Sequence, residues 1–181
     1  MKTVKLLFII FSIVYLGYLA LPSPDFPTPL PGILQSTEPA DTETPLRRSY
    51  FTDLSRAEVL KHYQDELECN TWCKLPFLTY RLNYPPEEAY AIIRDQTRST
   101  FLEEIVHPFR ESVFINGFEP KNDKDIIFVE GKRWKQKITV KWVPTSITAR
   151  MITGVLTLFS ICLIYLGWVK VFTIGRRKLG W

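Results

Sequence analysis

The stretch MITGVLTLFSICLIYLGWV at residues 151–169 contains no charged residue, and Arg150 and Lys170 flank it. A helix rises about 1.5 Å per residue, so a stretch of this length crosses the roughly 30 Å hydrocarbon core of a bilayer. With its flanks, the stretch predicts a transmembrane helix over residues 147–172. We therefore expect an integral protein of the plasma or cell membrane.

A second uncharged apolar segment, Leu6–Leu21, lies near the other end of the chain and follows Lys2 and Lys5. Two interpretations fit it: an uncleaved transmembrane anchor (a signal anchor), or a secretory signal peptide. A cleavage site needs small residues, and Tyr18 stands where one is required. We expect residues 1–21 to form an anchor, with the signal peptide as the alternative.

The distribution of basic residues predicts the orientation of both segments, because Lys and Arg gather on the cytoplasmic side of a membrane. Lys2 and Lys5 precede the first segment, and the next basic residue after it is Arg47. Basic residues also follow the second segment, within a tail at residues 173–181. Basic residues before the second segment argue the opposite way, but long loops cross membranes largely regardless of charge. We expect both termini to be cytoplasmic and the central domain to be extracytoplasmic.

The region between the apolar segments divides by composition. Seven prolines fall between Pro22 and Pro45, which predicts an extended, Pro-rich extracytoplasmic stalk over residues 22–46. Residues 47–144 have the length of one small domain. Its patterning predicts an α+β fold, with a small, mainly antiparallel sheet and helices on one face. The expected strands are 48–52, 77–84 and a hairpin over 125–142, and the expected helices are 53–67, 85–93 and 100–113, the last kinked at Pro108.

The last expected strand carries basic side chains on one face. Apolar residues and Gln136 alternate with Arg133, Lys135, Lys137 and Lys141, so that the four cations share a side. One interpretation is contact with anionic lipid headgroups or an anionic envelope polymer. The other is an ordinary solvated face, whose lysines discourage edge pairing.

Cys69 and Cys73 are spaced Cys-x₃-Cys. In an extracytoplasmic domain this pair is a candidate disulfide, and free buried thiols are the alternative. A single pair does not make a zinc site, and the spacing is not that of a redox motif.

Glu103, Glu104 and His107 have helical spacing and are the candidate ligands for a metal ion. Carboxylate-bridged sites in helical bundles need more such units than this chain offers, so we expect no metal. The chain also lacks phosphate-loop, dinucleotide-binding, nucleophile-elbow and zinc-protease motifs. We therefore expect no catalytic residue and no cofactor.

The leading hypothesis is a non-enzymatic, two-span membrane protein whose domain binds a partner protein or the cell envelope surface. The alternatives are an envelope enzyme that uses Glu103, Glu104 and His107, and a small structural subunit of a larger membrane complex. The expected partners are the bilayer, a membrane protein or a second copy of the chain. The net charge of +4 is mild for a chain of 181 residues, and we expect no nucleic acid.

Overall fold

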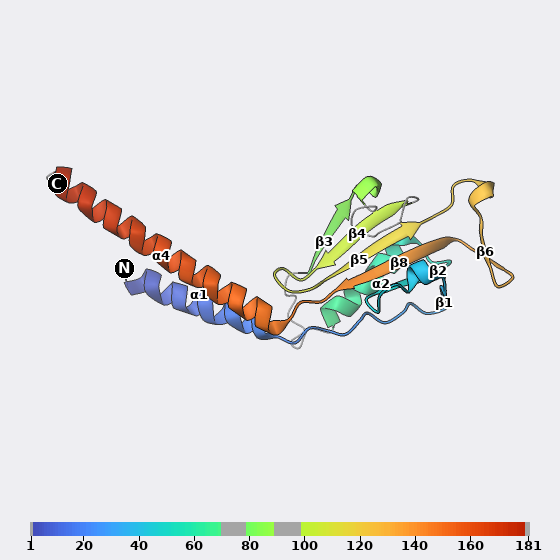
Figure 1. Cartoon of the computed structure of the whole chain (residues 1–181), viewed down its shortest axis with the longest axis horizontal. Coiled ribbons are helices and arrows are strands. Elements are labelled where there is room, and N and C mark those ends of the chain that lie inside the picture. The colour runs from blue at the N-terminus through green and yellow to red at the C-terminus, as the bar shows by residue number, and fades with distance from the viewer. Residues whose placement is uncertain (1, 70–78, 89–98, 180–181) are drawn as a thin grey trace. The chain divides into compact units, whose positions relative to one another are not determined.

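The computed structural model describes residues 2–69, 79–88 and 99–179 (Figure 1). The chain forms two units. The helical unit comprises Met1–Pro22 and Thr145–Trp181, and the domain comprises Ser23–Pro144.

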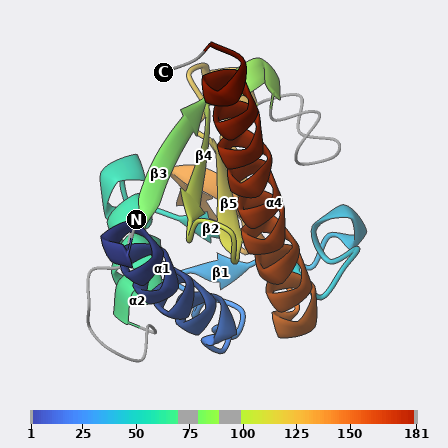
Figure 2. The same ribbon diagram turned by 90° about the vertical axis from the view of Figure 1, so that its left-hand side faces the viewer.

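The helical unit contains α1 (Lys2–Ala20) and α4 (Ile147–Leu179), and α4 is one unbroken helix (Figure 2). By length and composition, α1 and the Ile147–Thr173 part of α4 could each cross a membrane. The two helices pack closely at Gly154, where an added Cβ would lie 2.5 Å from Leu19 Cδ1. Near this contact, Arg150 Nη2 donates a hydrogen bond to the Leu21 carbonyl at 3.0 Å. The apolar segments of the sequence are therefore helical, as predicted.

The domain is built on a six-stranded antiparallel sheet in the order β1-β2-β8-β5-β4-β3, which confirms the α+β prediction. A separate two-stranded hairpin, β6–β7, interrupts the chain between β5 and β8. The strands are β1 (Leu34–Gln35), β2 (Arg47–Thr52), β3 (Tyr80–Tyr84), β4 (Phe101–Val106), β5 (Ser112–Phe118), β6 (Ile127–Val129), β7 (Lys132–Trp134) and β8 (Gln136–Val143). Short 3₁₀ turns occur at Pro39–Asp41 (η1), Pro86–Glu88 (η2) and Asp123–Asp125 (η3).

Helix α2 (Arg56–Cys69) covers one face of the sheet and closes the core. It begins at Arg56, within the predicted helix 53–67, after a capping box in which the Ser55 N–H donates to the Glu58 carboxylate at 2.7 Å. The helix places apolar residues three and four apart against the sheet. The fully buried core includes Val59, Leu60, Tyr63, Leu67, Tyr50, Ile105, Val113, Ile115, Ile138 and Val140.

The helix expected over residues 100–113 is wrong. These residues form β4 and the start of β5, and the turn between them places Phe109 at φ 62°. The apolar residues of Phe101–Val106 lie three and four apart, which fits the helical period. A separation of four also places Phe101 and Ile105 on one face of a strand, so the spacing does not exclude a strand. Backbone pairing to β3 on one side and β5 on the other decides for the strand.

The stalk expected over residues 22–46 is also corrected. Ser23 onward belongs to the domain, and Leu30 is 4% exposed within its core, with Phe26 and Ile33 packed beside it. β1 then pairs with the edge of β2. The prolines are compatible with packing because apolar side chains stand between them and reach the core. The domain therefore begins at 23 rather than at 47.

Other expectations are confirmed in part. β3 lies within the predicted strand 77–84, and the predicted hairpin over 125–142 is found as β6–β7 followed by β8. Of the helix predicted over 85–93, the described part is the turn η2, and its remainder lies outside the described residues.

Candidate functional site

The domain has two distinct ends, set by the direction of its strands. Both connections to the helical unit leave from the end at the β4–β5 turn, because Ser23 Oγ lies 3.1 Å from Glu111 Oε2 and Ser112 pairs with Val143. At the opposite end of the sheet, β5 finishes and β8 begins. Residues 119–135 occupy that end and are called here the distal tip (Figure 1).

The distal tip is organised by the β6–β7 hairpin. Its turn residues Glu130 and Gly131 have φ values of 51° and 75°, as a tight hairpin with right-handed strand twist requires. Trp134 is 8% exposed, and its indole N–H donates to the Val129 carbonyl at 3.4 Å. Lys132 Nζ lies 3.8 Å from the centre of the Trp134 ring. The buried Trp134 side chain therefore covers one face of the hairpin.

Asp53 fixes this hairpin to the body of the domain. Its carboxylate accepts from Lys132 Nζ at 2.6 Å and from the Lys135 backbone N–H at 3.1 Å. These hydrogen bonds, with that from Lys132 the strongest, lower the pKa of the Asp53 carboxyl below its ordinary value. Gln136 adds a hydrogen bond to the Leu54 carbonyl at 2.6 Å. The hairpin is thus held in one position on the domain.

The other face of the hairpin carries large apolar side chains in solvent. Phe128 is 67% exposed and Ile126 is 37% exposed. Phe128 lies directly across the hairpin from Arg133, whose side chain makes no ion pair with any described residue. An aromatic side chain beside an arginine is the composition typical of the centre of a protein–protein interface.

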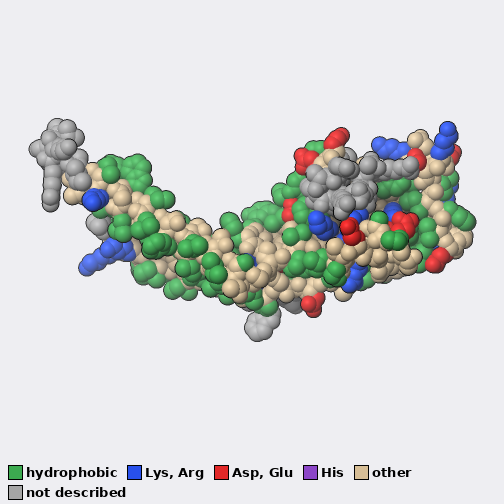
Figure 3. All heavy atoms as spheres, viewed as in Figure 1, with side chains coloured by type: hydrophobic (Ala, Val, Ile, Leu, Met, Phe, Trp, Pro, Cys, Tyr) green, Lys and Arg blue, Asp and Glu red, His purple; other side chains and the backbone are tan. Residues whose placement is uncertain are grey.

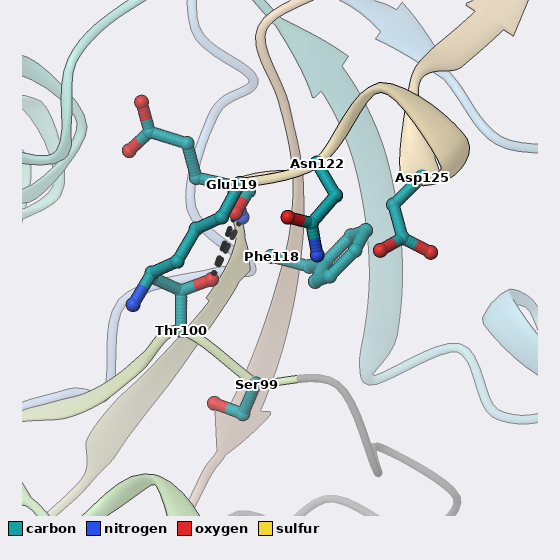
Figure 4. A pocket seen from close by; sticks show the side chains of 7 residues that line it. Ser99, Thr100, Phe118, Glu119, Asn122 and Asp125 are labelled. Carbon is teal, nitrogen blue, oxygen red and sulfur yellow. Dashed lines mark hydrogen bonds between the residues drawn. The ribbon is translucent and has the colours of Figure 1, made fainter.

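Two open pockets flank the loop that leads into the hairpin, and both include Glu119. The first, of about 500 Å³, is shown in Figure 4 and is lined by Ser99, Thr100, Phe118, Glu119, Lys121, Asn122 and Asp125. The second, of about 410 Å³, is lined by Asp53, Glu119, Pro120, Ile126, Arg133, Trp134 and Lys135.

The hydroxyl groups of Thr100 and Ser99 in the first pocket form hydrogen bonds within the domain. Thr100 Oγ1 accepts from the Glu119 backbone N–H at 2.9 Å, and Ser99 Oγ donates to Asn116 Oδ1. Among the described residues that line either pocket there is no histidine or cysteine.

The candidate metal ligands do not share a site. Glu103 and Glu104 are neighbours on β4, so their side chains lie on opposite faces of the sheet. Glu103 pairs with two arginines, Glu104 accepts from the Tyr84 hydroxyl at 2.6 Å, and His107 Nδ1 lies 2.9 Å from Glu111 Oε1. The helical spacing that suggested the cluster does not exist, and the described residues contain no other group of three potential ligands.

The predicted cationic face is divided between three surroundings. Arg133 and Lys135 belong to the distal tip, and Lys135 Nζ lies 3.8 Å from Glu119 Oε1. Lys137 is drawn into a polar network, and the side chain of Lys141 is half-buried in the middle of the sheet. β8 lies between β2 and β5, so its lysines do not protect a sheet edge.

No local pattern in the sequence indicates the network around Lys137. Asp41, which is 2% exposed, accepts from Lys137 Nζ at 2.7 Å, Ser36 Oγ at 2.6 Å and Ser49 Oγ at 2.8 Å. Burial opposes ionisation of Asp41, but these three hydrogen bonds outweigh it and lower the pKa of its carboxyl. Lys137 Nζ also lies 2.8 Å from Glu38 Oε2. The network fastens residues 36–41 onto the outer face of the sheet.

The candidate disulfide between Cys69 and Cys73 lies outside the residues whose side chains are described. The exposed aromatic face of the distal tip was also missed, although its signal is present. In a hairpin with Trp134 on one face, the alternation of Ile127, Phe128 and Val129 places Phe128 on the other.

The chain matches no protein-family model, no curated protein sequence and no solved structure. Its class therefore follows from its own architecture. It combines an α+β domain with two helices that are long and apolar enough to cross a membrane.

Proposed function

We propose that this chain is a two-span membrane protein whose extracytoplasmic domain binds a partner protein through the distal tip, without catalysing a reaction. The observation that carries the proposal is the exposed Phe128 face on a hairpin that is otherwise fixed to the domain.

The apolar surface of α1 and α4 supports the membrane part of the proposal. Side chains along both helices are more than half exposed within the chain, among them Phe11, Leu156 and Phe159 at 57–58%. Figure 3 shows apolar side chains gathered along the helical unit. Continuous apolar surface of this extent is unfavourable in water, and hydrocarbon is the solvent that suits it. Lys2 and Lys5 precede the first apolar segment, and Lys170 follows the second. These basic residues favour a cytoplasmic location for both termini.

The geometry of the distal tip supports the binding part. Association costs conformational entropy when a loop must be ordered, and a hairpin held by Asp53 and Trp134 has lost most of that freedom before binding. Phe128 contributes little to the core because two thirds of it is exposed. Its burial in a partner would release water from apolar surface and stabilise the complex.

The first experiment tests topology. A Lys124→Cys variant, made in a chain whose own cysteines are replaced by serine, is treated in intact cells with a membrane-impermeant maleimide. We expect label on the thiol introduced at position 124 without permeabilisation, and label on an Arg177→Cys variant only after it. The reverse pattern, or recovery of the chain in the soluble fraction without detergent, contradicts the proposal.

The second experiment tests the tip. A photo-reactive amino acid at Ile126 is activated in native membranes, in chains that carry Phe128→Ser or the matched control Tyr80→Ser. Tyr80 is 51% exposed and lies on β3, away from the tip. We expect one discrete adduct that Phe128→Ser abolishes and Tyr80→Ser leaves intact. An adduct at twice the mass of the chain identifies the partner as a second copy, and an adduct unaffected by Phe128→Ser contradicts the proposal.

A further inference from the structure

Two arginines converge on one buried carboxylate on the face of the sheet that α2 covers. Glu103 Oε1 accepts from Arg56 Nε at 2.8 Å and also from Arg56 Nη2. The other oxygen, Oε2, lies 3.0 Å from Arg81 Nε. The Glu103 side chain is 2% exposed, whereas those of Arg56 and Arg81 are 43% and 52% exposed. The carboxylate is therefore inside the protein, whereas both arginine side chains are partly exposed to solvent.

Three elements bring these residues together. Arg56 is the first residue of α2, Arg81 lies on β3 and Glu103 lies on β4. Asn83, the cross-strand partner of Glu103, accepts from Arg56 Nη2 at 3.1 Å. The Arg56 guanidinium also lies 4.8 Å from the centre of the Phe101 ring. Arg56 is thus fixed by a carboxylate, an amide and an aromatic ring, and its orientation is set before any ligand arrives.

The charges of these three side chains do not balance. One carboxylate faces two guanidinium groups, so these three side chains carry a net positive charge. Arg56 Nη1 and both Nη atoms of Arg81 make no hydrogen bond or ion pair with residues 2–69, 79–88 or 99–179. A single arginine would neutralise Glu103, so the second one is in excess of what this carboxylate requires.

We propose that the Arg56–Arg81 pair is a binding site for a small oxyanion, either a phosphate group or a carboxylate with two free oxygens. The planar fork of a guanidinium matches both anions through paired N–H···O bonds, and charge-assisted bonds of this kind are the strongest that a side chain offers. The buried Glu103 acts as the positioning residue, because it holds two like charges side by side. This site is separate from the distal tip and does not depend on the tip binding a partner.

The test uses the full chain in a non-ionic detergent. Sodium phosphate, sodium acetate and sodium chloride are compared at equal ionic strength, and the midpoint of thermal unfolding is followed. At ten times the dissociation constant, a specific ligand should raise the midpoint by about 5 °C relative to chloride. A rise with phosphate alone assigns a phosphate ligand, and a rise with both anions includes carboxylates.

Variants distinguish specific anion binding at Arg81 from a general effect of salt on stability. Arg81→Gln leaves Arg56 to neutralise Glu103 and should abolish the rise, and Arg81→Lys, which keeps the charge but loses the fork, should weaken it. The matched control Arg133→Gln removes an exposed arginine at the distal tip and should retain the full rise. The proposal is overturned if neither anion exceeds chloride, or if the rise persists unchanged in both Arg81 variants.

Discussion

Replacing Asp41 by asparagine removes the negative charge at the centre of the network that holds residues 36–41 on the sheet. Removing one member of a buried ion pair costs about 3–5 kcal/mol, because the remaining charge is left uncompensated. Here Lys137 retains Glu38 at 2.8 Å and its side chain is 21% exposed, so water screens part of the loss. We expect Asp41→Asn to lower the free energy of unfolding by about 2–3 kcal/mol.

Unfolding of the full chain in urea, followed by tryptophan fluorescence, to which the buried Trp142 contributes, measures this change. The dependence on pH identifies its origin. The folded protein lowers the pKa of Asp41, so its contribution is present above the ordinary value of 3.8 and is lost as the pH falls through the folded pKa. The pKa of Lys137 is raised from 10.5, since hydrogen bonds to Asp41 and Glu38 outweigh its burial. Its contribution is therefore present below pH 10.5 and is lost at higher pH.

The difference between wild type and Asp41→Asn should accordingly be constant from about pH 5 to 9 and shrink below about pH 4. Asp123→Asn, at an exposed acid in η3, is the matched control and should change stability by less than about 0.5 kcal/mol. Adding Lys137→Met to Asp41→Asn removes both charges and should recover part of the loss. A loss below about 0.5 kcal/mol for Asp41→Asn, or one that is the same at about pH 3 and pH 7, would refute the reasoning.

Three further predictions follow from close contacts and one hydrogen bond. Gly154→Leu should separate α1 from α4, because a Cβ at position 154 would lie 2.5 Å from Leu19 Cδ1. We expect this variant to unfold at a lower SDS concentration than the wild type. Gly167→Leu is the control, since a Cβ at position 167 meets nothing within 4 Å. Gly117→Ala should lower the free energy of unfolding by about 1–3 kcal/mol, because the added methyl group meets the Phe101 ring. Adding Phe101→Leu to this variant should restore part of the lost stability. If no stability is restored, the contact with Phe101 is not the cause. The hydrogen bond to Glu104 raises the pKa of Tyr84 to about 12. Ultraviolet titration should therefore show one tyrosine that ionises at about this pH, and the pKa of that tyrosine should be lower in Glu104→Gln. An unchanged titration curve in Glu104→Gln would contradict the assignment.

Several features were predictable because local sequence decides them. The length and lack of charge of the two apolar segments predict long helices regardless of the rest of the chain. The capping box at Ser55 and Glu58 and the turn at Glu130-Gly131 depend only on residues within four positions of one another. The alternation after Lys132 predicted which side of β8 is buried.

Other features are decided by contacts between residues far apart in the chain. Residues 101–106 fit a helix or a strand by pattern, and the backbone groups of β3 and β5 select the strand. Residues 23–46 are rich in proline, yet Leu30 packs in a core that is otherwise built from other segments of the chain. Composition does not report such long-range partners.

The candidate sites follow the same division. The sequence determined the hairpin, the two apolar helices and the helical start at Arg56. The alternation of residues 127–129 placed Phe128 opposite Trp134, but tertiary structure alone set Arg56 beside Arg81 on Glu103, 47 residues beyond Arg56 in the chain. Hydrogen bonds within a turn form among neighbours, whereas a shared carboxylate or an exposed face exists only once distant strands have paired.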